Sequence, residues 1–537
     1  MIRARAPVAA AALVALLGAC GTSSSAPAAS PQGRDAAPSP APLPARLRRL
    51  SNAEYVETLS ALVGFRVELP SSFPPDLLEA GFSANGRQGV DATYAAEAQG
   101  LAHALAARAT RDRFTQLVPC APARPGCAEE FVERFERRAY RRAPRPDEIA
   151  GGVALFESAA KGGGFAAGVE QVIATLLVSP AVLYVSELGT AAPSGGRELS
   201  SDEAASVLAY MLTGSPPDEE LMRAAAGGEL FAAEQRVAQA WRLLGKSDTR
   251  YQFRRFVREW LGLDALATLN KPVADDQNLR LGLLAETDAF VDEVFMYEGA
   301  SLDRLLTADF TVIPASLRAF EGLPPAAAGE VYGRVALDGT ARLGLLQQPS
   351  FLAVFSHESQ TAPVLRGKAI LERFLCVELP RPSELGLLVT FPPANPGLTT
   401  RERHAQHTRD PSCRGCHRSI DALGFTFENF DFIGRARGDE NRRPIDTRAD
   451  YTGPDGPHAF EDSRDVARWL AASPRAHECF ARQAFRFFTG QHDAGAEAAF
   501  LLERSRLPSE RQRDLFATLV AYVGSPWFMQ RSEAHAP

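Results

Sequence analysis

The residues best suited to chemistry in this sequence form one short run, Cys413-Arg414-Gly415-Cys416-His417. On a helix, the thiols of Cys413 and Cys416 would lie one turn apart on the same face. Two thiols at that spacing can each add to one vinyl group of a haem, and a histidine directly after the second cysteine can offer its imidazole to the iron. The run therefore predicts one covalently attached haem c, with His417 as the proximal iron ligand.

Three other interpretations of this run stay open. Cys413 and Cys416 could form a disulfide, although no thioredoxin-like βαβ pattern surrounds them. A structural zinc ion would need four ligands, usually from a second paired half-site, and the remaining candidates Cys376 and Cys479 are single. The run could also be a purely structural knot.

The ligand on the other face of the iron is not determined by the sequence. His407 lies shortly before Cys413, with enough chain between them to pass around a haem edge, so it is the leading distal ligand. An open position is an equal alternative and would favour catalysis over simple electron transfer. The other side chains considered are those of His357, His404, His458, His477, His492 and Met529.

Charged residues around the run could tune or hold a haem. Asp421, Glu428 and Asp431 could bond to the motif imidazole or to propionate-side groups. Capping and turn formation is the more ordinary role for acids at such positions. Arg366 and Lys368 are candidates to pair with haem propionates.

The first residues predict export. Arg3 and Arg5 precede an apolar stretch, residues 8–17, which has signal-peptide length and is too short to span a bilayer stably. Residues 17–20 (Leu-Gly-Ala-Cys) resemble the lipobox of bacterial lipoproteins, in which the cysteine is acylated after cleavage. An ordinary signal peptide is the alternative. We predict a lipoprotein anchored to a membrane through Cys20, on the periplasmic side or at the cell surface.

The remaining cysteines predict two disulfides, as expected in an oxidising compartment. Cys120 and Cys127 flank a short Pro/Gly-rich loop. Cys376 and Cys479 are then left, and their pairing would tie the segment before the haem run to the segment after it. Both pairings rest on parity, since a sequence alone does not determine connectivity.

Composition limits the classes of function. The 537 residues are 45% hydrophobic and 23% charged, which is typical of a globular protein of several domains. The net charge is −7 and the basic residues are scattered, so no nucleic-acid partner is expected. No Ser-His-Asp, phosphate-loop or metalloprotease pattern supports hydrolysis.

Apolar residues recur mostly at helical spacing, and Ser51 to Glu54 form a capping box before the first such stretch. Strand patterns are few, the best being residues 310–313 and 387–390. The chain is therefore predicted to be mainly α, with several helical modules in tandem, a C-terminal cytochrome c-like haem region and few short strands.

The sequence also resembles a family of exported bacterial proteins built from tandem domains of unknown function, numbered 1587, 1595, 1592, 1588 and 1585, often found beside cytochrome c-like modules. The resemblance covers nearly everything after residue 45 and is densest over 342–434. It is carried by Arg49-Leu50-Ser51, Gly81-Phe82, Arg138 to Arg142, Leu177 to Pro180, Pro217 to Leu221, Ala308 to Thr311, Arg342 to Leu346, Thr361 to Lys368, Gly424-Phe425, Glu428 to Asp431 and Phe488 to Gly490.

The N-terminal residues and the resemblance together predict an order of segments. These are a signal peptide (1–19), a lipid-anchored flexible tether (20–45), a 1587-like module (46–115), a 1595-like module (116–188), a 1592-like module (197–322), a 1588-like haem module (338–440) and a 1585-like module (441–532). The family usually has Met-Asp-Pro where this chain has Ile420-Asp421-Ala422. That Met would lie on the same side of the iron as His417, so its replacement leaves haem binding unaffected. The family's closing Gly-Arg is Gly490-Gln491 here, which puts any role of that arginine in question.

Three classes of function remain. The first is a redox protein whose haem passes electrons to or from a partner cytochrome or another redox protein. The second is a haem c-dependent oxidase, peroxidase or oxygenase acting on an extracellular substrate. Electron carriers are usually small, so the large helical scaffold brings this second class closer to the first without placing it ahead. The third is a non-catalytic surface or assembly protein in which the CxxCH run is a structural disulfide.

Overall fold

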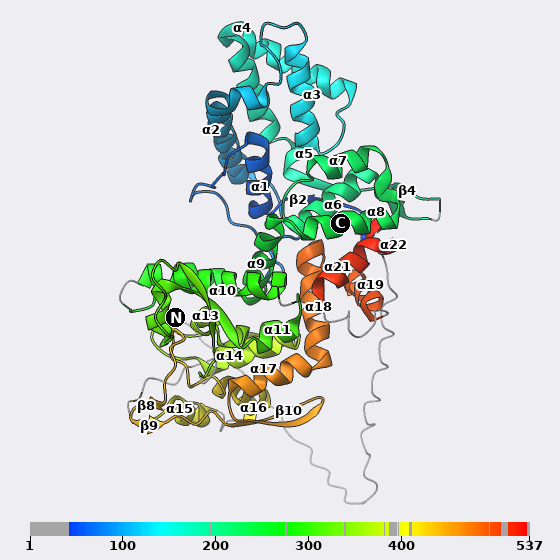
Figure 1. The fold of residues 1–537 in the computed structure, drawn as a ribbon. Coiled ribbons are helices and arrows are strands. Elements are labelled where there is room, and N and C mark those ends of the chain that lie inside the picture. The colour runs from blue at the N-terminus through cyan, green and yellow to red at the C-terminus, as the bar shows by residue number, and fades with distance from the viewer. Residues whose placement is uncertain are drawn as a thin grey trace, which may run out of the picture.

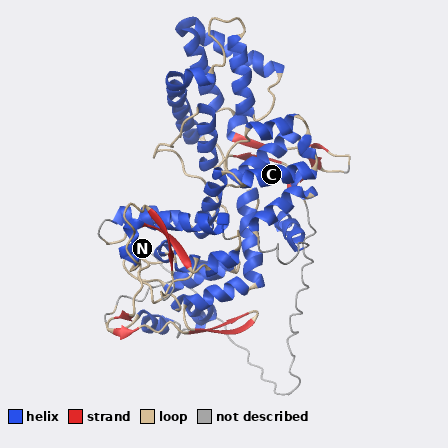
Figure 2. Cartoon of the chain, viewed as in Figure 1, coloured by secondary structure: helices blue, strands red, loops and turns tan. Residues whose placement is uncertain are grey.

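The structure is a computed structural model. It describes residues 42–193, 195–273, 276–297, 299–337, 340–380, 382–385, 395, 397–407, 411–492, 494–505 and 514–533. The predicted signal peptide, Cys20 and the strand predicted at 387–390 lie outside the described residues. Within them the chain is mainly α with few short strands, as predicted (Figure 2). No helix of the described part combines the length and the apolar character needed to cross a bilayer.

An N-terminal body has its own hydrophobic core, which includes Leu59, Phe131 and Ile173. The predicted capping box is present, because Glu54 N donates to Ser51 Oγ and Ser51 N donates to Glu54 Oε2. The body consists of β2 (Arg46–Arg49), α1 (Asn52–Val63), α2 (Ala92–Leu117), α3 (Cys127–Tyr140), α4 (Pro146–Leu177), α5 (Pro180–Leu183) and β3 (Tyr184–Glu187), as Figure 1 shows. The predicted 1587-like and 1595-like modules thus share one core.

The rest of the chain shares another core, which spans residues from Leu199 to Met529 and also includes Leu43 and Phe82. Its first helices and turns are α6 (Ser201–Thr213), α7 (Glu219–Ala226), η1 (Glu229–Phe231), α8 (Ala233–Leu244), α9 (Ser247–Leu261), η2 (Leu263–Ala267), α10 (Asp276–Tyr297), α11 (Leu302–Thr307), η3 (Ala315–Leu317) and α12 (Arg318–Glu321). Then follow η4 (Leu345–Gln347), α13 (Pro349–Val354), α14 (Pro363–Ala369), η5 (Ile370–Phe374), η6 (Pro382–Leu385), α15 (Thr400–His407), α16 (Pro411–Phe425), α17 (Ser463–Ala472), α18 (Pro474–Thr489), α19 (Ala494–Ser505), α21 (Leu515–Gly524) and α22 (Pro526–Met529).

The two ends of the described chain meet in one small sheet. β1 (Leu43–Pro44) runs parallel to β12 (Gln530–Ser532), which pairs on its other side with β5 (Arg197–Glu198), and β5 pairs with β4 (Thr190–Ala191). The flexible tether was predicted to extend to residue 45. Its last residues are instead fixed to the C-terminal strand by main-chain hydrogen bonds.

Most other strands form two-stranded antiparallel sheets. These are β6 (Phe310–Pro314) with β7 (Tyr332–Ala336), β8 (Asp439–Glu440) with β9 (Arg443–Pro444), and β10 (Ala449–Gly453) with β11 (Gly456–Phe460). The strand predicted at residues 310–313 is confirmed by β6.

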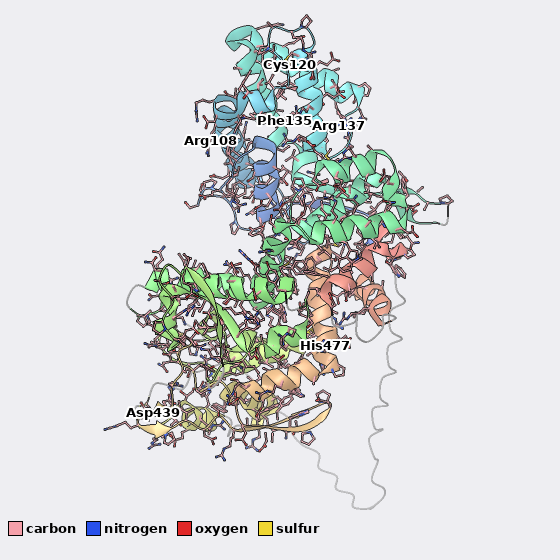
Figure 3. All side chains as sticks on the ribbon, in the orientation of Figure 1. Arg108, Cys120, Phe135, Arg137, Asp439 and His477 are labelled. Atoms are coloured by element: carbon pink, nitrogen blue, oxygen red, sulfur yellow. A yellow bond between two sulfur atoms is a disulfide. The ribbon has the colours of Figure 1, made fainter. Side chains whose placement is uncertain are left out.

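Both predicted disulfides are present. Cys120 bonds to Cys127 in the N-terminal body, where Figure 3 labels Cys120. Cys376 bonds to Cys479 across a sequence separation of 103 residues and joins the end of η5 to α18. Closing so long a loop restricts the unfolded chain, and disulfides of this kind typically stabilise a fold by about 2–4 kcal/mol.

A buried pair of carboxyl groups joins α10 to the segment that leads into the 1588-like module. Glu286 is completely buried and accepts a hydrogen bond from Thr311 Oγ1 at 2.6 Å. Glu321 contacts Arg342, whose Nε lies 3.2 Å from its Oε2. Burial, followed by the charge of Glu321, raises the pKa of Glu286 well above its usual value. Glu286 therefore keeps its proton on folding at pH values where the unfolded chain has lost it.

This pair makes stability depend on pH in a defined direction. A group whose pKa is raised by folding contributes stability that is lost as pH rises from its unfolded pKa through its folded pKa. Glu286→Gln removes this titration. Relative to the parent protein, its free energy of unfolding should rise with pH by up to about 1.4 kcal/mol per pH unit above pH 5. Urea unfolding at pH 5 and pH 8 measures this, with Glu293→Gln on the same helix as control, and parallel profiles for all three proteins would contradict it.

Candidate functional site

The whole CxxCH run lies on one helix, α16. The backbone positions of Cys413 and Cys416 are therefore one turn apart, as the prediction requires. The Cys413 side chain lies outside the described residues. Cys416 is half-buried and its thiol is free, whereas Cys120, Cys127, Cys376 and Cys479 are all in disulfides. A free thiol at this position is what thioether attachment needs.

Two glycines hold α16 against α14. A Cβ atom on Gly367 would come within 1.9 Å of the carbonyl oxygen of Ile420, and one on Gly424 within 1.9 Å of that of Pro363. No other residue type fits these positions without moving a backbone, so the two helices are in direct main-chain contact. This contact fixes the orientation of the helix that carries His417.

The imidazole of His417 contacts a carboxylate on its own helix. Its Nδ1 lies 3.0 Å from Asp421 Oδ1, and both side chains are largely buried. A carboxylate accepts the Nδ1 proton, and Nε2 is then the nitrogen whose lone pair suits a metal. Asp421 was considered either as a partner of the haem site or as a capping and turn-forming residue. The structure contains its contact with the imidazole.

The other two acids of the module hold turns and buried cations. Asp431 Oδ1 accepts from the backbone nitrogens of Ile433 at 3.0 Å and Arg435 at 2.8 Å, which is the turn-forming role. Glu428 is buried and accepts from Thr361 Oγ1 and from Arg437 NH2, each at 2.9 Å. Burial raises the pKa of Glu428 in spite of these partners.

Arg366 is placed differently from the prediction. Its side chain is completely buried, and its guanidinium donates to the backbone oxygens of Phe427 and Asp431, each at 2.8 Å, and to Ser356 Oγ at 2.9 Å. These bonds pin α14 to the turn after α16. Oxygens of the chain thus occupy both NH1 and NH2 of Arg366, which is a structural role. The haem-propionate contact expected from the sequence stays a prediction.

Lys368, the other predicted propionate partner, points elsewhere. Its ammonium lies 3.5 Å from Glu372 Oε1 on the exposed side of α14 and η5. It lines a cavity next to the Cys376–Cys479 disulfide, and neither Cys416 nor His417 lines that cavity.

The distal candidates separate into two groups. The His407 side chain lies outside the described residues, but its helix α15 packs beside the motif helix. Arg401 of α15 stacks 4.5 Å from the ring centroid of Phe425, and His404 meets the same ring edge-on at 6.1 Å. Helix α15, which contains His407, therefore lies beside the motif helix, and His407 stays the predicted distal ligand.

The remaining candidates have other contacts. His477 Nε2 lies 2.9 Å from Asp303 Oδ1, and His458 Nε2 lies 3.1 Å from Asp455 Oδ2. His492 is stacked on Phe82, and burial lowers its pKa to about 4. Burial also lowers the pKa of His357, and Met529 is in the hydrophobic core.

Sequence reasoning missed Arg437, which completes the charge network of the module. Its Nε donates to the backbone oxygen of Glu428 and its NH2 to the carboxylate of the same residue. Arg437 lies nine residues after Glu428, and no local pattern indicates that this arginine folds back onto it.

Four family models match the chain one after another. Residues 48–111 match PSD3, a protein of unknown function (DUF1587), and residues 127–187 match PSD5, of unknown function (DUF1595). Residues 199–323 match PSD4 (DUF1592), and residues 342–440, which contain α14 and α16, match PSCyt3 (DUF1588), both also of unknown function. No curated protein and no solved structure matches the chain. The 1585-like module stays a prediction.

Proposed function

Because this chain belongs to the family in which DUF1587, DUF1595, DUF1592 and DUF1588 domains follow one another, we propose a function centred on its DUF1588 domain. That domain binds one haem c covalently, and the protein is an exported, lipid-anchored redox protein that passes electrons to or from a partner redox protein. The observation that carries this proposal is the contact between His417 and Asp421 on the helix that holds both motif cysteines.

The side chains of the run suit a haem by their chemistry. Cys413 and Cys416 would form the two thioether bonds, and His417 would offer Nε2 to the iron while Asp421 holds Nδ1. Haem, when bound, supplies a one-electron couple. Asp421 keeps the imidazole electron-rich and correctly oriented, and the Gly367–Gly424 contact keeps the helix from rotating.

Optical spectra and a potentiometric titration of the haem-loaded protein test the proposal. A low-spin ferric spectrum, together with a reversible one-electron transition, is expected for an electron carrier. A high-spin ferric spectrum that changes with added ligands would instead support the haem c-dependent oxidase, peroxidase or oxygenase considered from the sequence. The absence of any reversible transition would overturn the redox proposal.

Asp421→Asn should raise the midpoint potential. The charged carboxylate strengthens electron donation from His417 to ferric iron, and an amide does so less. The expected shift is upward by about 60 mV, which is a tenfold change for a one-electron couple. Asp439→Asn, at an exposed strand of the same domain, should leave the potential unchanged. Equal potentials in the two variants would contradict this role of Asp421.

The lipid anchor at Cys20 has its own test. The two disulfides are consistent with export. Cys20→Ala should move the protein from the membrane fraction to the soluble fraction of cell extracts, since stable anchoring depends on acyl chains at this residue. Cys416→Ala should stay with the membranes. Equal partition of the parent protein and Cys20→Ala would contradict the anchor.

A further inference from the structure

A cavity of about 550 Å³ lies beside the Cys376–Cys479 disulfide, away from the candidate haem site. Three segments that are distant in sequence build it. They are the Ala80-Gly81 turn of the N-terminal part, the α14–η5 segment, and α18. The volume is in the range of sites for small organic ligands. Its lining residues are Ala80, Gly81, Lys368, Glu372, Arg373, Cys376, Val377, Glu378, Leu379, Arg482, Gln483 and Arg486.

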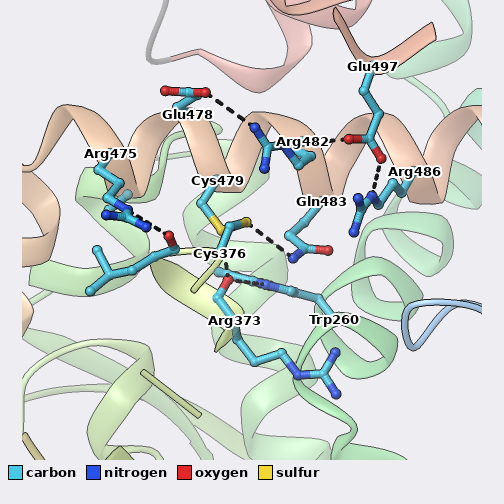
Figure 4. Close-up of a disulfide and its surroundings, with 12 residues drawn as sticks. Trp260, Arg373, Cys376, Arg475, Glu478, Cys479, Arg482, Gln483, Arg486 and Glu497 are labelled. Atoms are coloured by element: carbon cyan, nitrogen blue, oxygen red, sulfur yellow. Dashed lines mark hydrogen bonds and ion pairs between the residues drawn. A yellow bond between two sulfur atoms is a disulfide. The ribbon is translucent and has the colours of Figure 1, made fainter. Parts of the chain in front are cut away.

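Cations dominate the inner wall of this cavity. Arg482 and Arg486 project from α18 and share the carboxylate of Glu497, and Arg482 also pairs with Glu478, as Figure 4 shows. Lys368 lies near Glu372 on the opposite wall. Glu378 is exposed at the rim. An anion entering the cavity would therefore meet arginines on one side and a lysine on the other.

Arg373 differs from these cations because its guanidinium has no partner among the described residues. Its backbone oxygen accepts from Trp260 Nε1, as Figure 4 shows, whereas no described residue forms a hydrogen bond or an ion pair with its side chain. Burial lowers the pKa of Arg373. The nearby charge of Glu372 offsets this only in part, and a half-buried guanidinium that makes no direct ion pair favours an external anion.

The protein holds this unpaired guanidinium in place. Arg373 lies on η5, a π-helical turn of the kind that often occurs at functional sites. Gly81 has a φ of +95°, and a Cβ atom there would come within 2.8 Å of Arg373 NH1. The guanidinium therefore packs directly against the backbone of the turn. The disulfide fixes η5 against α18, so the cationic walls keep their spacing.

We propose that this cavity binds the oxyanion group, a carboxylate or a phosphate, of a small ligand, with Arg373 as its main contact. The planar guanidinium offers paired N–H donors that match two oxygens of either group. Arg482, Arg486 and Lys368 add positive potential around it. The site is independent of the proposed haem, and its failure would leave the redox proposal untouched.

Isothermal titration of the full chain with inorganic phosphate, and separately with malonate, tests the proposal at constant ionic strength. Saturable binding of at least one probe is expected. Binding of phosphate alone indicates a phosphate ester as ligand, and binding of malonate alone indicates a carboxylate. Arg373→Gln should weaken the binding at least tenfold. Arg468→Gln, an exposed arginine on α17 outside the cavity, should leave it unchanged.

Two results would overturn the proposal. One is the absence of saturable binding of both probes to the parent protein. The other is equal affinity in the parent protein, Arg373→Gln and Arg468→Gln. If Arg373→Gln does not fold, as judged by circular dichroism, Lys368→Gln decides instead, because that side chain is half-exposed and has one partner. It should weaken the binding at least threefold, and an unchanged affinity would count against the site.

Discussion

Replacing Cys413 and Cys416 together by alanine should abolish covalent haem completely, because no thiol remains on α16 to form a thioether bond. The parent protein, produced in cells that attach haem c, should keep its haem through denaturing electrophoresis, and the double variant should not. In-gel peroxidase staining for haem reads this directly. Each single variant should retain a weaker stain, because one thioether bond can still form.

The matched control removes a different pair of cysteines. Cys120→Ala with Cys127→Ala eliminates the disulfide of the N-terminal body, which lies at the opposite end of the molecule from Asp439 of the DUF1588 domain (Figure 3). This variant should stain as strongly as the parent protein. Persistent staining of the Cys413/Cys416 double variant would show that haem is not attached at this run.

Arg366→Met should destabilise the protein by about 3–5 kcal/mol, as is usual when one partner of a buried charged network is removed. The variant removes one of the two donors to each of the carbonyls of Phe427 and Asp431, and it removes the cation 3.8 Å from Glu428. Urea unfolding of the parent protein and the variant measures the loss. A change below about 1 kcal/mol would contradict the structural role assigned to Arg366.

Two further variants separate the contribution of charge from that of packing to the stability of this network. Arg435→Met removes a half-exposed arginine that pairs with Asp431, and exposed pairs of this kind contribute at most about 1 kcal/mol. Glu428→Gln combined with Arg366→Met should recover part of the lost stability, because the buried carboxylate no longer lacks its neighbour. Additive losses in the double variant would mean that Arg366 and Glu428 do not interact energetically.

Local sequence patterns predicted the features that depend on neighbouring residues. Ser51 and Glu54 form their capping box, and Ser200 with Glu203 forms a second one, because three residues suffice to specify this geometry. The contact of Asp421 with His417 is also local, since residues four apart share a helix face. The two disulfides could be predicted from the parity of the cysteines in an exported chain.

Features that depend on distant contacts had no such pattern. Leu43 pairs with Arg531 through a two-residue strand, which is too short for alternation to be recognised. The guanidinium of Arg373 packs against Gly81, which lies far upstream in the sequence. The residues next to Arg373 in the sequence therefore do not indicate this contact.

The most direct test of the central claim is a pyridine haemochrome spectrum of the full chain, denatured after expression with the haem-attachment machinery. Covalent attachment through two thioether bonds predicts a haem c spectrum that stays with the polypeptide after extraction with acidified organic solvent, at one haem per chain. Haem that passes into the solvent, or a denatured chain without any haem, would contradict attachment at Cys413 and Cys416 and with it the proposed redox function.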